Sequence, residues 1–191
     1  MKKITLTISA LLFFGGLTIT RAQNDAGMKA WMDYMTPGDV HKMLAKSDGV
    51  WNAEMTSWMA PNTPPSKMTT TCTNKMILGG RYQESTFTGT MNGMAFEGRG
   101  TLAYDNALKK FISTWIDNLG TGLTVLEGRW DDATKSLNSK GKTVDPTTSK
   151  EIMMREVFKI IDDNTQSLEI YMTGADGKEF KSMEAKLTRK T

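Results

Sequence analysis

From residue 50 onward, short runs with two-residue alternation are separated by residues that reverse the backbone, and this pattern restricts the fold more than any other feature. The separators are rich in Gly, Pro, Asn and Asp, as in Gly79-Gly80, Asn92-Gly93 and Asp145-Pro146. The runs between them predict strands at 50–59, 67–78, 82–91, 94–104, 110–117, 123–130, 135–140, 151–161, 167–173 and 179–189.

Regularly spaced strands joined by short turns predict an antiparallel meander, and a sheet of this many strands removes its edges by closing. We therefore expect an all-β fold, an antiparallel up-and-down β-barrel of about ten strands preceded by short helices. The clearest part is 98–130, which reads as three strands and two turns. The predicted organisation is a signal peptide at 1–22, a helical segment at 23–48 and a barrel domain at 49–191.

The N-terminal sequence has the layout of a secretory signal peptide. Met1-Lys2-Lys3 precedes an apolar run, and Thr20-Arg21-Ala22 offers a cleavage site. We expect export to the periplasm or the cell exterior, without a stable membrane anchor because the apolar run is short. Removing this segment deletes three basic residues and no acid, which lowers Lys plus Arg from 24 to 21 against 21 Asp plus Glu. The remaining chain is neutral, with no basic cluster for nucleic acid.

Two short helices are predicted before the strands. The first, at 26–35, carries an apolar stripe of Met28, Trp31, Met32 and Met35. Packing, docking in an envelope assembly and Cu(I) binding by thioethers are alternative interpretations of this stripe. Further methionines that extend the Cu(I) hypothesis are Met91, Met94, Met153 and Met154. The second helix is predicted to follow Thr36 as N-cap and to end near Ser47.

The single Cys and the single His give no metal site. Cys72 lies in a predicted strand, where a free Cys is typically a small buried residue, and it has no partner for a disulfide. His41 lies on the second predicted helix and is interpreted as a packed or surface residue, because zinc needs more ligands of this kind. We predict no metal and no cofactor.

Carboxylates in the strands leave an enzymatic hypothesis open, with Glu97, Asp117 or Glu127 as acid or base. Asp117, like Asp105, also stands at a predicted turn, where it would accept backbone N–H bonds. Glu97 shares a strand face with Arg99, and Glu127 shares one with Arg129. These pairs would be solvated ion pairs on the outside, or a charged patch inside the barrel that orients a polar or anionic head group.

Gly49-Val50-Trp51 after a short helix resembles the opening of the lipocalin-like, or calycin, barrels. This resemblance implies that Trp51 closes the barrel floor and that Arg189 lies across it. The chain also resembles a bacterial exported family, the domain of unknown function fifteen seventy-nine, which implies the same barrel and no established activity. That second resemblance rests on Gly79-Gly80-Arg81, Gly98-x-Gly100, Tyr104-Asp105, Ser113-Thr114-Trp115-Ile116-Asp117, Glu127-Gly128 and Asp176-Gly177-Lys178-Glu179.

Within the calycins, the nitrobindin-like branch holds haem through a His on the barrel. No predicted strand here carries a His, so we do not expect haem. We predict instead a barrel that binds a small, largely apolar or amphipathic molecule. The predicted ligand-binding residues are Tyr82, Arg99, Tyr104, Trp115, Asp117, Glu127 and Arg129. The ligand, the oligomeric state and the inward face of each strand remain open at this point.

Overall fold

The computed structural model describes residues 17–91 and 93–190. The helices are α1 (Leu17–Met35) and α2 (Asp39–Ala45). The strands are β1 (Gly49–Ser57), β2 (Ser66–Ile77), β3 (Tyr82–Met91), β4 (Met94–Asp105), β5 (Lys110–Asp117), β6 (Thr124–Asp131), β7 (Ser136–Asp145), β8 (Lys150–Asp162), β9 (Thr165–Thr173) and β10 (Glu179–Arg189).

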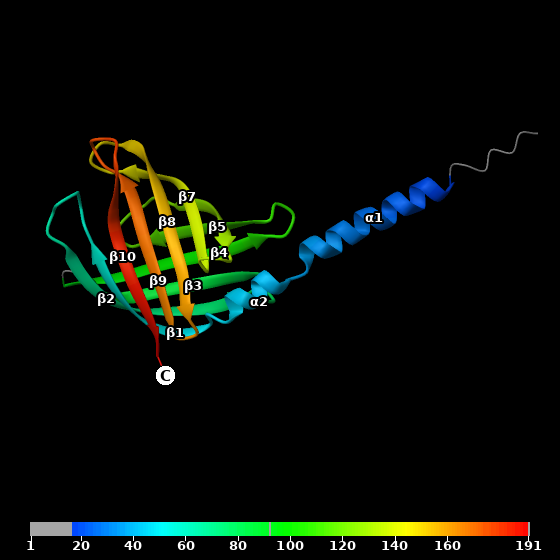
Figure 1. The fold of residues 1–191 in the computed structure, drawn as a ribbon, viewed down its shortest axis with the longest axis horizontal. Helices are drawn as coiled ribbons and strands as arrows, with labels where there is room; N and C mark the ends of the chain where they lie inside the picture. The colour runs from blue at the N-terminus through cyan, green and yellow to red at the C-terminus, as the bar shows by residue number, and fades with distance from the viewer. Residues whose placement is uncertain (1–16, 92, 191) are drawn as a thin grey trace, which may run out of the picture. The chain divides into compact units, whose positions relative to one another are not determined.

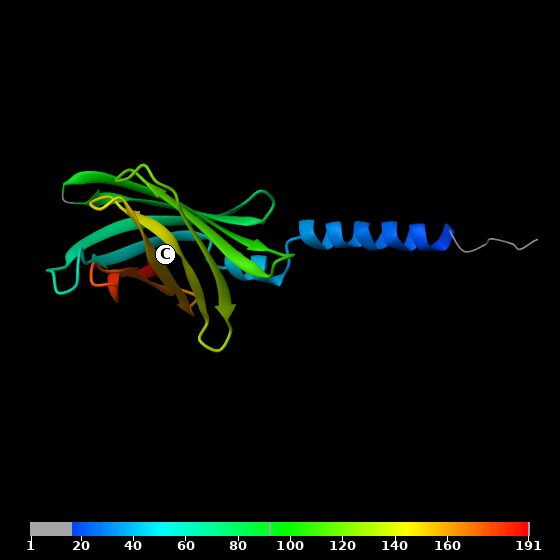
Figure 2. The ribbon, with the colours of Figure 1, turned by 90° about the horizontal axis from the view of Figure 1, so that it is seen from above.

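The strands form one closed antiparallel barrel (Figure 1). Each strand pairs with its neighbours in sequence, and β1 pairs with β10, so that no edge strand remains. Viewed from above, the strands wind around a common axis (Figure 2). The predicted all-β, up-and-down barrel of ten strands is confirmed.

Strand boundaries agree with the prediction to within two residues at all but one end. The exception is β7, which was expected to end at residue 140 and continues to Asp145. Gly141 resembles a strand breaker in the sequence, yet here a Cβ at this position would overlap the carbonyl oxygen of Val125 on β6. Glycine at this point permits close strand approach rather than a turn.

Two apolar clusters fill parts of the barrel. One joins β1, β2 and β10 around the fully buried Trp51 and Cys72. The other brings Leu44 of α2 against Phe111 and Leu137, and α2 thereby covers one end of the barrel. The opposite end is formed by the loops that connect β1–β2, β3–β4, β5–β6, β7–β8 and β9–β10.

The floor next to α2 depends on Arg189. Its guanidinium lies 4.2 Å from the centre of the Trp51 ring and donates to the carbonyl oxygens of Lys46 (2.6 Å), Asp48 (2.6 Å) and Asp163 (3.0 Å). The indole Nε1–H of Trp51 donates to the Ser47 carbonyl at 2.9 Å. The expectation that Trp51 closes the floor with Arg189 across it is confirmed.

Helix α2 begins at a different cap from the one predicted. Its N-cap is Gly38, whereas the Thr36 hydroxyl donates back to the Met32 carbonyl. The predicted Thr36 cap is therefore wrong. His41 is buried, and its Nδ1 accepts the Gly38 N–H at 3.0 Å, which satisfies the backbone donor of the N-cap residue. Burial and the charge of Arg81 lower the pKa of His41, so it is a packed structural residue.

The described part of the chain divides into two units, one ending at Thr36 and one beginning at Pro37. Helix α1 belongs to the first and α2 to the second, together with the barrel. Most of the predicted signal peptide lies outside the described residues. None of the described helices is both long and apolar enough to cross a membrane.

The Arg189 contacts predict a large loss of stability in Arg189→Ala. Three carbonyl oxygens lose a charged donor and Trp51 loses its cationic partner, so we expect a loss of about 2 to 4 kcal/mol in the free energy of unfolding. Urea denaturation measures it. Lys186→Ala, on the exposed face of the same strand, should stay within about 0.5 kcal/mol of the parent. Equal losses in the two variants would contradict the assigned role of Arg189.

Candidate functional site

Strand register divides the barrel residues into an inner and an outer face, and the inner face of β3 to β7 alternates large apolar residues with glycines and serines. Gly98 lies opposite Phe87 and Asp117, and Ser113 lies opposite Leu102 and Leu126. The glycines and serines on this inner face are Ser85, Gly89, Gly98, Gly100, Ser113, Gly128, Ser139 and Gly141. At these eight positions the five strands place little side-chain volume inside the barrel.

Trp115 lies flat against this wall. A Cβ at Gly98 would overlap its six-membered ring, and a Cβ at Gly100 would lie 3.5 Å from it. The indole Nε1–H donates to Oδ2 of Asp117 at 2.7 Å, and Phe87 meets the ring edge-on at 5.4 Å between centroids. The indole of Trp115 is thus held along β4 by its contacts with Asp117 and Phe87.

Several side chains that point inward from the middle of their strands are only partly buried. They include Ser85, Phe87, Leu102, Ser113, Trp115, Glu156 and Ile170. On the other side, the inner face carries flexible methionines in opposed pairs, Met55 with Met68 and Met154 with Met172.

Glu156 is the functional candidate that the sequence reasoning missed. It points inward from the middle of β8, between Ser139 of β7 and Ile170 of β9. Among the described residues its carboxyl group makes no hydrogen bond or ion pair, and burial alone raises its pKa from 4.5 to about 7. The alternation Ile152, Met154, Glu156, Phe158 and Ile160 could have identified it, because four of these five inward residues are apolar.

Four of the predicted ligand-binding residues lie on the outer face: Tyr82, Arg99, Glu127 and Arg129. Arg99 donates to Glu97 at 2.9 Å, and Lys110 pairs with Glu127 at 2.7 Å. Glu97 and Arg99 form the exposed ion pair of the first alternative, whereas Glu127 pairs with Lys110 and not with Arg129. Neither carboxylate lies inside the barrel.

The other three, Tyr104, Trp115 and Asp117, lie on the inner face. Asp117 stands at the end of the barrel away from α2, where Oδ1 accepts the Leu119 N–H at 2.9 Å and Oδ2 accepts the indole N–H of Trp115. Asp105 accepts the N–H groups of Ala107 and Leu108 at 2.8 Å each. Both aspartates therefore have the turn-forming role that the sequence predicts.

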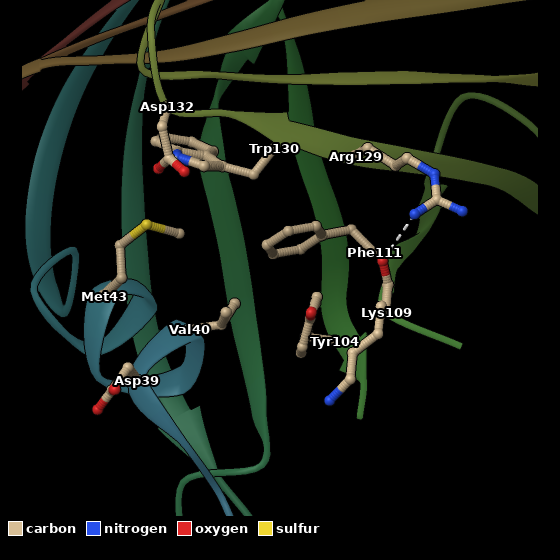
Figure 3. Close-up of a pocket in the computed structure, with 9 residues that line it drawn as sticks. All are labelled: Asp39, Val40, Met43, Tyr104, Lys109, Phe111, Arg129, Trp130 and Asp132. Atoms are coloured by element: carbon tan, nitrogen blue, oxygen red, sulfur yellow. Dashed lines mark hydrogen bonds between the residues drawn. The ribbon is translucent and has the colours of Figure 1, made fainter. Parts of the chain in front are cut away.

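A groove of about 420 Å³ lies beside α2 (Figure 3). Its apolar base consists of Val40 and Met43 with the inward-facing Phe111 and Trp130, so the packed cluster under α2 separates it from the middle of the barrel. Arg129 Nη1 donates to the Lys109 carbonyl at 3.2 Å on the rim. The groove is lined by Asp39, Val40, Met43, Tyr104, Lys109, Phe111, Arg129, Trp130 and Asp132.

Metal-ligand and nucleophile chemistry find little support in the described residues. Within them, no group of three His, Cys, Asp or Glu side chains is arranged to hold a metal ion. Burial raises the pKa of Cys72 to about 12, and its Sγ donates to Asn74, so Cys72 has the buried role predicted for it. The predicted Cu(I) methionines are spread over α1, the β3–β4 hairpin and β8, where Met153 faces outward and Met154 inward.

The Trp115 packing predicts opposite outcomes at two neighbouring glycines. Gly98→Ala should reduce stability by about 1 to 3 kcal/mol, because the new methyl group can be accommodated only if the indole moves away from Asp117. Gly100→Ala makes an ordinary 3.5 Å contact and should change stability by less than about 1 kcal/mol. Thermal unfolding of both variants tests this, and similar effects would contradict the assigned ring position.

Burial of Glu156 predicts a pH-dependent stability difference. A carboxyl with a pKa near 7 in the folded protein and 4.5 in the unfolded chain imposes no cost below the lower value, loses stability as the pH rises between the two, and costs up to about 3 kcal/mol above pH 7. Glu156→Gln should therefore match the parent in acid and exceed it in stability at neutral pH. Urea denaturation at several pH values tests this, with the outward-facing Glu127→Gln as control; a pH-independent difference for Glu156→Gln would contradict it.

Comparison with known proteins supports the fold. A crystal structure of Rv2717c from M. tuberculosis is 14% identical with a TM-score of 0.61, covering 82% of this chain and all of that one. The S-type phycobiliprotein lyase CPES from Guillardia theta is 8% identical with a TM-score of 0.57, covering 84% of this chain and 97% of the lyase. No curated protein matches the sequence.

A family model matches residues 36–189, which include α2 and all ten strands. The chain therefore belongs to the family described as "Protein of unknown function (DUF1579)".

Proposed function

We propose that this protein binds a small, largely apolar molecule inside its barrel. The observation that carries the proposal is the inner face of β3 to β7, where glycines and serines lie between the large residues and several inward side chains are only partly buried. Protein interiors are ordinarily packed to high density, so small, partly buried positions inside a closed barrel favour space for a guest.

The other residues on the inner face suit an apolar guest. Trp115 and Phe87 present aromatic surface on one side, and the methionines of β1, β2, β8 and β9 present adaptable thioethers on the other. Polar groups on the inner face, among them Ser85, Ser113 and Glu156, would orient a guest. The end of the barrel away from α2 is the proposed route of entry.

We also propose that the protein is exported. The support is the basic start, apolar run and small-residue cleavage site within residues 1–22. The fold is compatible with an oxidising compartment because its lone Cys72 is buried and its stability depends on packing. Fractionation of host cells, with N-terminal sequencing of the recovered protein, tests this location; a cytoplasmic protein that retains residue 1 would contradict it.

Two measurements test the binding proposal. Native mass spectrometry of protein purified from its own host should show a co-purified small molecule, and calorimetry should detect binding of decanol as a simple apolar probe. Ser113→Phe should weaken decanol binding at least tenfold, on the order of 1.4 kcal/mol, because the ring enters the interior. Thr114→Phe is the matched control, since its ring points outward from the same strand.

Circular dichroism establishes that both variants keep the barrel. Equal decanol binding by Ser113→Phe and the parent would contradict an interior site. Absence of both a co-purified molecule and decanol binding would contradict the function itself.

A further inference from the structure

We propose that the natural ligand carries a basic nitrogen and that this nitrogen pairs with Glu156. The inference rests on the proposed function and assigns the ligand class to a hydrophobic amine. Its basis is the negative charge of Glu156 on the inner face of the barrel. The sequence had instead suggested inward arginines that would bind an anionic head group.

Among the described strand residues that share the inner face by register, the ionisable acids are Glu156 in the middle of β8 and Asp117 and Asp145 at the end away from α2. Asp145 lies opposite Lys150 and accepts the Thr147 N–H at 2.8 Å, and no Lys or Arg of the described strands faces inward between the floor and that end. Asp117 is already engaged by Trp115 and by the Leu119 backbone. Glu156 has no such partner. Glu156 is partly buried on the inner face, and a carboxylate in this largely apolar surround without a donor is costly, so its binding partner is expected to arrive with the ligand.

The neighbours of Glu156 define the shape of this subsite. Ser139 lies opposite it on β7 and supplies one hydroxyl, while Ile170 lies opposite it on β9. Along β8, the inward residues on either side are Met154 and Phe158. One charged acceptor within an apolar surround suits a compact ammonium head group attached to an apolar body.

The same arrangement disfavours an anionic ligand. The arginines that could bind a carboxylate lie outside, where Arg99 is paired with Glu97 and Arg129 donates to a backbone carbonyl. A carboxylate placed inside would meet Glu156 without a compensating cation, and like charges at close range repel.

The pairing couples binding to the protonation of Glu156. The inward residues packed beside it from β7 and β9 are Ser139, Gly141, Ile170 and Met172, none of which is charged or titrates near neutral pH. The proton on Glu156 below neutral pH must therefore leave when an ammonium group binds, and burial of this carboxyl makes that release measurable.

Calorimetry with decylamine, decanol and decanoic acid tests the inference on the full-length protein at about pH 8, where Glu156 is ionised. We expect decylamine to bind at least tenfold more tightly than decanol, and decanoic acid to bind most weakly. Glu156→Gln should lose the preference for decylamine and keep its affinity for decanol. Glu127→Gln, which removes a carboxylate from the outer face, should retain the preference.

At about pH 6, the parent should release up to one proton for each decylamine bound, measured as a dependence of the binding enthalpy on the buffer, and Glu156→Gln should release none. Equal affinity for decylamine and decanol, or a preference that survives in Glu156→Gln, would overturn the inference and leave the proposed function intact. Failure of all three probes to bind would instead overturn the proposed function.

Discussion

Closure of the sheet between β1 and β10 is the constraint on which the rest of the structure depends. Every other strand pair joins neighbours in sequence, whereas this pairing brings Trp51 opposite Arg189. Arg189 reinforces the junction because one planar group stacks on the indole and bridges the carbonyls of the α2–β1 connection and the β8–β9 turn. Without this closure the sheet would have two free edges and no enclosed inner face.

The architecture could be predicted almost completely from local sequence, because turn residues and strand alternation are local signals. The β3 and β5 boundaries agree with the expected ones. The predicted β7 ended just before Gly141, where close contact with β6, a tertiary feature, favours glycine within a continuing strand. The predicted Thr36 cap was wrong because α2 begins at Gly38, whose N–H donates to the imidazole of His41.

The candidate site was much harder to predict, because the residues of β4 and β6 do not reveal which face of each strand points into the barrel. In β4 the inner positions include Gly98 and Gly100, which carry no hydrophobic signal, while Glu97 and Arg99 outside attract attention as chemistry. In β8 the signal was present: Glu156 interrupts an apolar face, and charged residues on such a face are costly unless they have a role. A charged residue on an otherwise apolar strand face indicates the inward side more reliably than a possible ion pair does.

The mixed composition of the inner face determines which positions of the barrel tolerate change. Large, fully buried side chains occur on both sides, with Trp51 on β1 and Phe111 on β5, so substitutions there change stability first. Gly141 is equally constrained, because a Cβ at this position would overlap the backbone of β6. Ser113 has no such role, so a larger side chain there would change the inner surface while the floor around Trp51 stays intact.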